Sequence, residues 1–251
     1  YFSTILLMKL PWDKICIINL KKNNKRLKNA LNQLKKEKIK GNKCVEAVYG
    51  YDFVPYGKQI KKTKNKKTRR YLLKKMRQKL IINKTLKRTK YRTLKIGEIG
   101  CNLSFLNTFK NALEKDYNKI LVLEDDFKLV PNFTNKVLNV MKHVPKDYDI
   151  LYLGINDINY KWGDFKKIND YLNKPLGSRS KIYDESHGAI YGNHGFIINK
   201  KAMKLFIKNT IPMTYPSDVT LGKLSTQKKL IKAFSLKDNL ITTHNFGSNT
   251  V

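Results

Sequence analysis

Three consecutive acidic residues are the clearest candidates for chemistry in this sequence. Glu124, Asp125 and Asp126 follow directly after an apolar run at 121–123. Carboxylates this close repel one another unless a cation joins them, and hard oxygen ligands suit Mg²⁺ or Mn²⁺. Such an ion, bridging a diphosphate, would neutralise charge on a leaving group. The alternative is an acidic turn that caps the following helix, and the triplet alone does not decide between the two.

A predicted strand places these acids. Residues 119–123 form a continuous apolar run, which is typical of a strand buried on both faces. The opening of the chain predicts a strand, a helix and a second strand, an order that favours a parallel sheet covered by helices. Ligands of such sheets gather beyond the carboxyl ends of the strands, where the acids lie. Further strands are predicted at 14–20, 44–49, 149–154, 189–199 and 231–235, and helices at 23–34, 97–113, 133–141, 202–207 and 218–227.

Two segments interrupt this regular pattern. From 58 to 92 roughly half of the residues are Lys or Arg, and the apolar residues between them permit one or two basic amphipathic helices. They would form a lobe or flap laid over the sheet, or else an insertion that is merely solvated and partly mobile. Residues 156–188 predict a long polar connection that carries binding residues or a mobile lid. We expect one domain over 1–251 with the basic insertion at about 58–92.

The net charge of +33, from 52 Lys and Arg against 19 Asp and Glu, should attract polyanions. The excess is mostly Lys, however, and accompanies abundant Asn and Ile, which is what an AT-rich genome produces on any solvent face. Zinc-finger, basic-zipper and RNP patterns are absent from the sequence, so nucleic acid is not an expected partner.

Hydrophobic residues make up 41% of the chain, enough to fill a core, and no apolar run approaches the roughly 18 residues that span a bilayer. No transmembrane segment is therefore expected. Cys16, Cys44 and Cys101 lie far apart, which argues against a disulfide framework and a zinc site. A cytoplasmic location is favoured, with an endomembrane lumen as the alternative if a targeting segment has been removed. The oligomeric state is not predicted.

Short blocks of sequence occur in a characteristic order and spacing. They are Ile17-Ile18-Asn19-Leu20 with Arg26, Ala47-Val48-Tyr49-Gly50, Gly97-Glu98-Ile99-Gly100-Cys101-Asn102-Leu103-Ser104, Leu121-Val122-Leu123-Glu124-Asp125-Asp126, residues 149–154, Gly195-Phe196-Ile197-Ile198 with Ala202, and Pro216-Ser217-Asp218. Together they resemble glycosyltransferase family 25, which contains lipooligosaccharide and procollagen galactosyltransferases. The resemblance covers about 14–220 apart from the basic insertion. Two departures bear on acceptor choice: Phe105 stands where the family usually has His, and Tyr49 where it usually has Asp.

The resemblance implies a GT-A-like α/β fold, a Rossmann-related mixed sheet flanked by helices. It also implies an inverting, metal-dependent transferase that moves a hexose, galactose or glucose, from a UDP-sugar to a hydroxyl of a glycan or of a hydroxylysine-type, collagen-like acceptor, with Mn²⁺ or Mg²⁺. The alternative is a catalytically inactive glycosyltransferase-like module that binds polyanions or a protein partner through its basic surface. Another nucleotide-dependent transferase on the same scaffold is a third hypothesis, because fold does not fix function.

The expected metal ligands are Asp126, Glu124 and His244, and Asp125 is expected to face the ribose or the sugar. His187 and His194 are further possible partners of the metal or the diphosphate. A base must take the proton of the acceptor hydroxyl, and Asp218 is the candidate. Its alternative role is to cap a helix, for which Ser217 is equally suited.

The remaining candidates are expected to bind the donor. Asn19, Leu20 and Arg26 should lie near uracil and phosphate, although Arg26 has the alternative of a helix-surface cation. Gly97, Glu98 and Gly100 predict a tight turn into a helix whose free N–H groups meet the donor. For the glycines the alternative is close packing. Gly50 and Ser104 complete the set of expected donor-binding residues.

Overall fold

A mixed sheet of eight strands forms the centre of the computed structural model, which describes residues 10–89, 93–155, 163–178, 190, 192 and 194–244. The strands lie in the order β2-β1-β3-β8-β5-β9-β7-β6. Their bounds are β1 Lys14–Asn19, β2 Asn42–Glu46, β3 Lys119–Glu124, β5 Ile150–Gly154, β6 Gly163–Lys167, β7 Leu172–Ser178, β8 Gly195–Asn199 and β9 Ala233–Leu236.

The strand directions bring several carboxyl ends to one edge of the sheet. β1 runs parallel to both β2 and β3, which confirms the predicted opening unit. β8 lies between β3 and β5 and is antiparallel to both, so β3 and β5 point the same way. β9 is parallel to β5. The acids after β3 therefore share an edge with the ends of β1, β2, β5 and β9.

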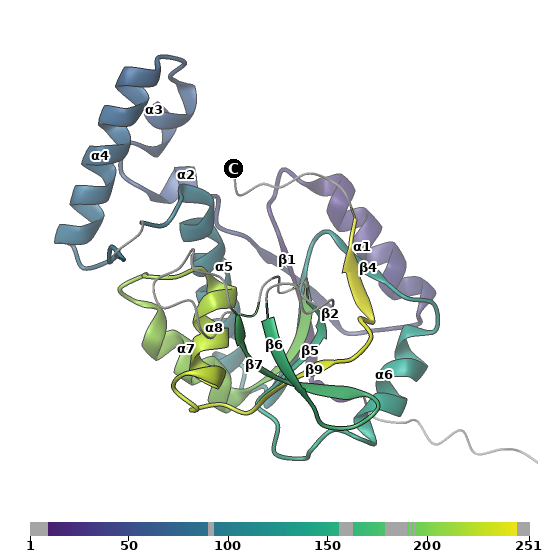
Figure 1. Cartoon of the computed structure of the whole chain (residues 1–251). Coiled ribbons are helices and arrows are strands. Elements are labelled where there is room, and N and C mark those ends of the chain that lie inside the picture. Colours follow the sequence, from purple (N-terminus) through teal and green to yellow (C-terminus); the bar gives the residue numbers. More distant parts are fainter. Residues whose placement is uncertain are drawn as a thin grey trace, which may run out of the picture.

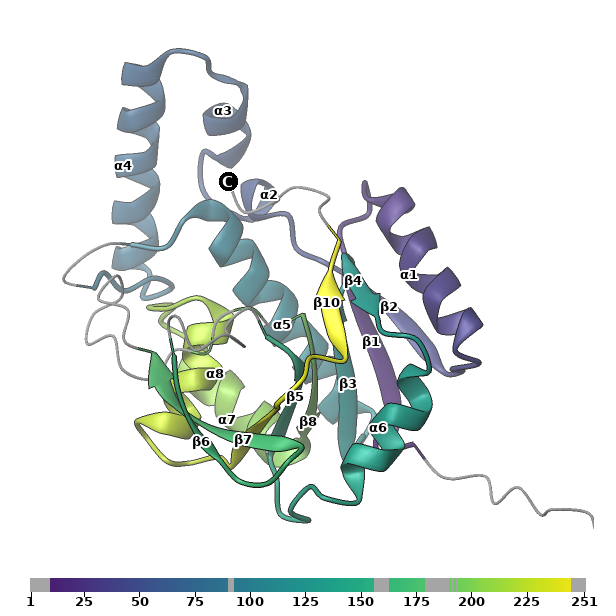
Figure 2. The same cartoon turned by 45° about the vertical axis from the view of Figure 1, so that its right-hand side comes forward.

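Helices cover both faces of the sheet because successive strand residues point to opposite sides. Ile15 and Ile17 of β1 face α1 (Asn24–Lys36) and α6 (Phe133–Met141), whereas Cys16 and Ile18 face the other core. That second core contains α5 (Ile96–Glu114), α7 (Lys200–Thr210) and α8 (Ser217–Thr226). Figures 1 and 2 show the two layers of helices on either side of the strands. The predicted mixed α/β sheet flanked by helices is confirmed.

Part of the segment predicted to be a long polar connection is a β-hairpin. β6 pairs antiparallel with β7, and β7 continues the sheet by pairing Leu172 with Leu236 of β9. Leu172 is fully buried. Most of its neighbours along the hairpin are polar, which is compatible with a position at the edge of the sheet. The prediction was wrong for residues 163–178, and residues 156–162 and 179–188 lie outside the described part of the chain.

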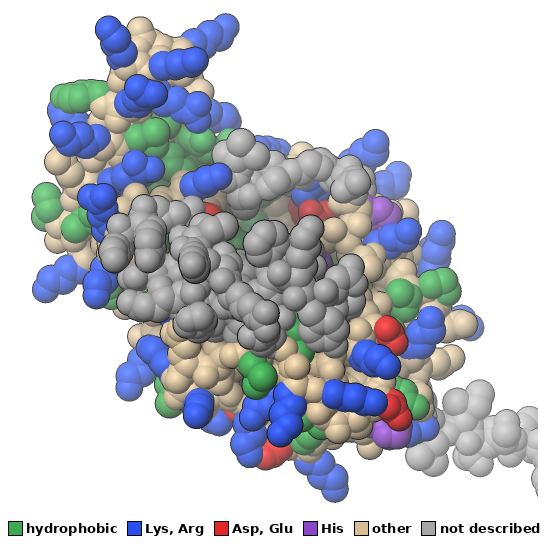
Figure 3. All heavy atoms as spheres, viewed as in Figure 1, with side chains coloured by type: hydrophobic (Ala, Val, Ile, Leu, Met, Phe, Trp, Pro, Cys, Tyr) green, Lys and Arg blue, Asp and Glu red, His purple; other side chains and the backbone are tan. Residues whose placement is uncertain are grey.

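The basic insertion is helical, as predicted. After the short α2 (Gly50–Phe53), α3 (Gly57–Lys62) and α4 (Lys66–Ile82) form a helical pair that we call the basic arm. Asn65 caps α4 by accepting a hydrogen bond from the backbone N–H of Thr68 at 3.0 Å. Contrary to the expected flap over the sheet, the arm stands beyond the end of α5 (Figures 1 and 2). Blue Lys and Arg side chains are spread over it and over the same face of the main body (Figure 3).

Apolar contacts join the base of the arm to the main body. Met76 and Leu80 of α4 are buried in the same core cluster as α5. Just after α4, Leu86 forms a β-bridge with Met213, and the N–H of Lys87 donates to the carbonyl of Met213 at 3.0 Å. None of the helices in the described ranges is long and apolar enough to cross a membrane.

Candidate active site

The acidic triplet lies where β3 ends and the chain turns into a short ribbon. Glu124 is the last residue of β3, and Asp125 and Asp126 form the turn before β4 (Phe127–Leu129). β4 pairs antiparallel with β10 (Ile241–Thr243), a ribbon that the sequence did not predict. The ribbon brings the N–H of His244 to 2.8 Å from the carbonyl oxygen of Asp126. The last described residues of the chain therefore close one side of the acidic turn.

Arg26 supplies a cation to two of the acids. Its guanidinium lies 3.1 Å from Oδ1 of Asp125 and 3.4 Å from Oδ2 of Asp126, with only 12% of the side chain exposed. The amide of Asn23 donates to Oδ2 of Asp125 at 3.2 Å. Both partners come from the start of α1, which directly follows β1. The mutual repulsion of the acids is thus partly offset by the chain's own arginine, and Arg26 lies inside the site rather than on the helix surface.

Two buried oxygen atoms beside this ion pair lack a hydrogen-bond partner within the described residues. They are Oδ1 of Asp126 and Oδ1 of Asn19, the last residue of β1. The Asn19 amide nitrogen donates to the carbonyl of Leu20, whose carbonyl also accepts from the N–H of Asn23 at 2.7 Å. A buried oxygen without a partner is costly, and native proteins rarely leave one. Both atoms are therefore available to a ligand.

Burial and like charge raise the pKa values of the acids. The pKa of Glu124 rises to about 8, first because burial disfavours the anion and then because Asp126, Asp218 and Asp125 lie nearby, while Arg26 opposes the rise. The pKa of Asp126 is raised by burial and by Asp125, and lowered by Arg26 and His244. A bound cation would reverse both shifts, since an opposite charge favours the ionised form.

The raised pKa of Glu124 makes protein stability depend on pH. Glu124 ionises near its ordinary pKa of 4.5 when unfolded but at about 8 when folded, so its contribution is present at low pH and is lost as pH rises through 8. Between pH 6.5 and 8.5, without metal, we expect Glu124→Gln to remove roughly 1–2 kcal/mol of the fall in unfolding free energy. Urea unfolding at the two pH values measures this. An unchanged fall in the variant would contradict the assignment.

Asp218 lies in the first turn of α8. Its Oδ1 accepts from the N–H of Val219 at 2.8 Å, and its Oδ2 accepts from the N–H of Gly192 at 3.3 Å. Burial raises the pKa of Asp218, while these two N–H groups lower it. Its charge contributes to the raised pKa of Glu124. Pro216 is the N-cap of α8, so the alternative that Ser217 or Asp218 caps this helix was wrong.

The comparisons with known proteins agree on a family. A sequence model of glycosyltransferase family 25 (LPS biosynthesis protein) matches residues 12–221. This chain belongs to glycosyltransferase family 25.

Relatives in this family are much longer than the present chain. Procollagen galactosyltransferase 2 of Mus musculus is 30% identical over 149 residues, which cover 58% of this chain and 21% of that protein. Inactive glycosyltransferase 25 family member 3 of Homo sapiens is 32% identical over 71 residues, or 27% of this chain and 12% of that protein. The chain thus spans about a fifth or less of these two relatives.

A solved structure of apo UDP-glucose pyrophosphorylase resembles this chain with a TM-score of 0.44 and 10% identity. The match covers 89% of this chain and 90% of that protein. A TM-score this low does not bear on function.

The glycine-rich family block forms a tightly packed junction. A Cβ atom on Gly50 would lie 2.1 Å from the carbonyl oxygen of Ile96, and one on Gly100 would lie 2.6 Å from that of Val48. Ser104 is buried, and its hydroxyl accepts from the N–H of Val48 at 2.8 Å and donates to the carbonyl of Gly100 at 2.7 Å. These contacts fit the close-packing alternative for Gly50 and Gly100, and they fix the end of β2 against α5.

The first turn of α5 faces the proposed base. Glu98 accepts a hydrogen bond from the N–H of Lys95 at 2.7 Å, which closes the start of the helix. Its charge also contributes to the raised pKa of Asp218. Gly97 lies in the same turn and is partly buried. The family's "GEIG" block therefore lies beside Asp218.

The two departures from the family pattern have different surroundings. Phe105 is 1% exposed, and its ring lies 5.9 Å from those of Phe109 and Phe196 and 6.4 Å from that of Phe206. This departure changes the core. Tyr49 lies between two cations, with Nζ of Lys22 at 4.2 Å and Nζ of Lys61 at 4.9 Å from its ring centre. No pattern in the sequence indicated that two lysines contact this ring.

The histidines divide between the site and the core. His244 follows β10, its backbone N–H donates to the carbonyl of Asp126, and its side chain contributes to lowering the pKa of Asp126. His194 is 8% exposed, and burial lowers its pKa to about 4, so it is neutral at physiological pH. Its carbonyl accepts from the N–H of Glu124 at 3.4 Å. His187 lies outside the described residues.

Sequence reasoning missed Asn23 and the β4–β10 ribbon. Asn23 lies three residues before Arg26, close to one helical turn, and this spacing could have indicated that the two side chains meet the same acid. The ribbon has no such signal, because its strands are three residues long and far apart in sequence. Within the described ranges, no group of three or more His, Cys, Asp or Glu side chains has the arrangement of a metal centre.

Proposed function

We propose that this chain transfers a hexose from a UDP-sugar to a hydroxyl of an acceptor, with inversion and with the help of a divalent cation. The observation that carries the proposal is the unpartnered Oδ1 of Asp126, in a cluster of acids at the carboxyl edge of a family 25 sheet. Ligands of open α/β sheets bind at that edge.

The residues present fit a Mg²⁺ or Mn²⁺ ion. Such ions usually take one or two protein carboxylates and fill their other positions with phosphate and water, so a complete protein ligand set is not required. Asp126 and Glu124 would hold the ion, with His244 as a further ligand beside Asp126. When bound, it would neutralise the charge of the departing diphosphate. Asp125, held by Arg26 and Asn23, is then placed to face the ribose or the sugar.

Asn19 and Leu20, at the end of β1, and Arg26, in the first turn of α1, would contact the nucleotide. The unpartnered Oδ1 of Asn19 is an acceptor that suits a donor group of uracil or ribose. Arg26 would orient Asp125 and offset the charge of the acids at the same time. Gly97 and Glu98 would then form the wall of the donor site next to Asp218, and the buried Gly50 and Ser104 would hold that wall from behind.

Asp218 would act as the base. The acceptor oxygen attacks the anomeric carbon, the bond from that carbon to the diphosphate oxygen breaks, and the hydroxyl proton goes to the Asp218 carboxylate. The N–H groups of Gly192 and Val219 fix the direction of that carboxylate. Burial raises its pKa, which makes it a stronger base than an exposed aspartate.

The second candidate function is an inactive module that binds polyanions or a protein partner. It is favoured by the Arg26 ion pairs, which already neutralise part of the acidic site, and by the basic arm. Some relatives carry the name of inactive family members. Such a module would lose affinity for its partner steeply with salt and would not respond to a UDP-sugar.

Thermal stabilisation by donors distinguishes the two. We expect UDP-galactose or UDP-glucose with Mn²⁺, at about 100 times Kd, to raise Tm by roughly 5–10 °C. GDP- and CMP-sugars serve as controls, and either component alone should give a smaller shift. Equal shifts with all nucleotide sugars, or none with the UDP-sugars, would contradict the proposed donor.

A further inference from the structure

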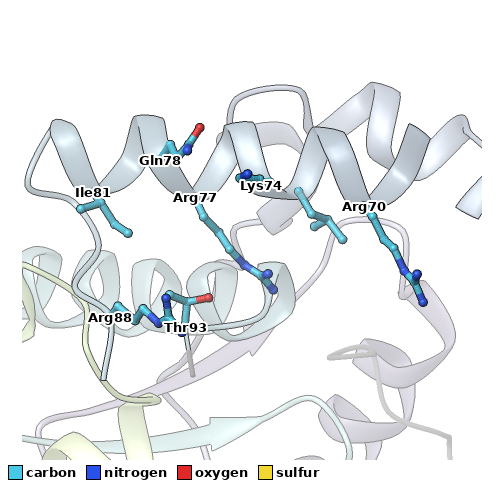
Figure 4. A pocket seen from close by; sticks show the side chains of 8 residues that line it. Arg70, Lys74, Arg77, Gln78, Ile81, Arg88 and Thr93 are labelled. Atoms are coloured by element: carbon cyan, nitrogen blue, oxygen red, sulfur yellow. The ribbon is translucent and has the colours of Figure 1, made fainter. Parts of the chain in front are cut away.

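A groove lies between α4 of the basic arm and the chain segment that leads to α5 (Figure 4). The groove has a volume of about 600 Å³, a size typical of sites for small ligands. Its lining consists of Arg70, Leu73, Lys74, Arg77, Gln78, Ile81, Arg88 and Thr93.

Positive charge dominates this groove. Arg70, Lys74 and Arg77 follow one another at helical spacing on one face of α4, and Arg88 adds a fourth cation from the opposite wall. The sequence contains no Asp or Glu between Asp52 and Glu98. Among the described residues, no ion pair involves these four side chains. Like charges one turn apart destabilise a helix. An anion bound in the groove would therefore stabilise α4 by offsetting the repulsion between these cations.

One buried nitrogen in the groove lacks a partner. Nε of Arg77 is inaccessible to solvent and has no hydrogen-bond acceptor in the described part of the chain. The side chain extends from α4 toward the segment that carries Arg88 and Thr93 (Figure 4). Arg77 as a whole is only partly buried, and a phosphate bound to its guanidinium would offset the cost of the unpartnered Nε–H group.

We propose that the groove binds the phosphate of a phosphorylated sugar, which is the acceptor of the reaction. The binding of phosphate is inferred from the residues of the groove alone. The role of the groove as the acceptor site rests on the function proposed above. Arginine forks match phosphate oxygens through paired hydrogen bonds. Leu73 and Ile81 would contact the carbon face of the sugar ring.

The position of the groove relates it to the acidic site. Thr93 on its wall precedes the first turn of α5, which begins at Ile96, by three positions. Helix α5 contacts the start of α8, where Sγ of Cys101 lies 3.5 Å from Oγ of Ser217, the residue before Asp218. An acceptor held by its phosphate in the groove can therefore extend past this turn toward the base. The same charge would repel a basic peptide, so the groove favours an anionic glycan over a collagen-like acceptor.

Fluorescence anisotropy with a labelled trisaccharide that carries one phosphate tests the binding. The groove variant combines Arg70→Gln, Arg77→Gln and Arg88→Gln. The matched control combines Lys66→Gln, Lys67→Gln and Lys79→Gln, which remove the same charge from α4 outside the groove. We expect the groove variant to bind at least about tenfold more weakly and the control within about twofold.

Three results would overturn this proposal. One is an equal loss of affinity in both variants, which indicates unspecific attraction by charge. Another is equally tight binding of the unphosphorylated trisaccharide. The third is tighter binding of a short DNA duplex that depends on the same three arginines, which would make the groove a nucleic-acid site.

Hydrolysis of UDP-galactose without acceptor separates this proposal from the function on which it rests. Both variants should keep that hydrolysis, because none of the replaced residues belongs to the acidic site. If hydrolysis is present but binding in the groove is absent, the acceptor proposal alone fails. If hydrolysis is absent and the phosphorylated sugar still depends on the arginines, the anion site stands and its role as acceptor site fails.

Discussion

Asp126→Asn is expected to lower hexose transfer from a UDP-sugar by at least about a thousandfold, because the amide cannot supply the anionic oxygen that a divalent ion needs. The carboxylate also carries the unpartnered Oδ1 at the centre of the site. Release of UDP from UDP-galactose in the presence of Mn²⁺, followed over time, measures the effect. The fold should persist, because burial already disfavours the charge of Asp126.

The control for this experiment is Asp170→Asn. Asp170 is an exposed aspartate that pairs with Lys167 on the β6–β7 hairpin. The substitution removes the same charge at a position far in sequence from the triplet. It should leave activity within about twofold, since surface ion pairs contribute little to stability. Activity of the Asp126 variant above a tenth of that of the unmodified protein would exclude Asp126 as an essential ligand.

Phe105→Ala is expected to lower the free energy of unfolding by about 3–5 kcal/mol, the usual cost of emptying a buried aromatic site. Phe105 is almost fully buried and packs against Phe109, Phe196 and Phe206, which come from α5, β8 and α7. Its removal therefore loosens the contact between two helices and the sheet. Urea unfolding followed by circular dichroism gives the change.

Phe53→Ala is the matched control, since Phe53 is 46% exposed and its removal leaves a smaller cavity. We expect this variant to lose less than about 1 kcal/mol. Comparable losses in both variants would show that Phe105 is not the centre of this core.

The elements whose apolar pattern is unambiguous were predicted from sequence. The run at 119–123 is a strand in which residues 120–123 are fully buried, and the helix predicted at 133–141 has those bounds in the structure. Prediction failed where burial depends on partners distant in the chain. The hairpin at 163–178 looks polar because it lies at the sheet edge, and only its pairing with β9 reveals it as part of the sheet.

The site shows the same division. The position of the acids followed from β3. The charge of Asp218 acts on the pKa of Glu124, and its role as the base stays a prediction. The partner of the acids did not follow, because a repelling triplet predicts only that some cation is near. The structure identifies Arg26 as such a cation within the chain.

Crystals soaked with MnCl₂ and UDP test the central claim most directly, through anomalous scattering from manganese. The account predicts a manganese peak about 2.0–2.2 Å from an oxygen of Asp126, with the diphosphate on its other side. A diphosphate bound without manganese, or an acidic turn that keeps only its Arg26 ion pairs, would contradict it.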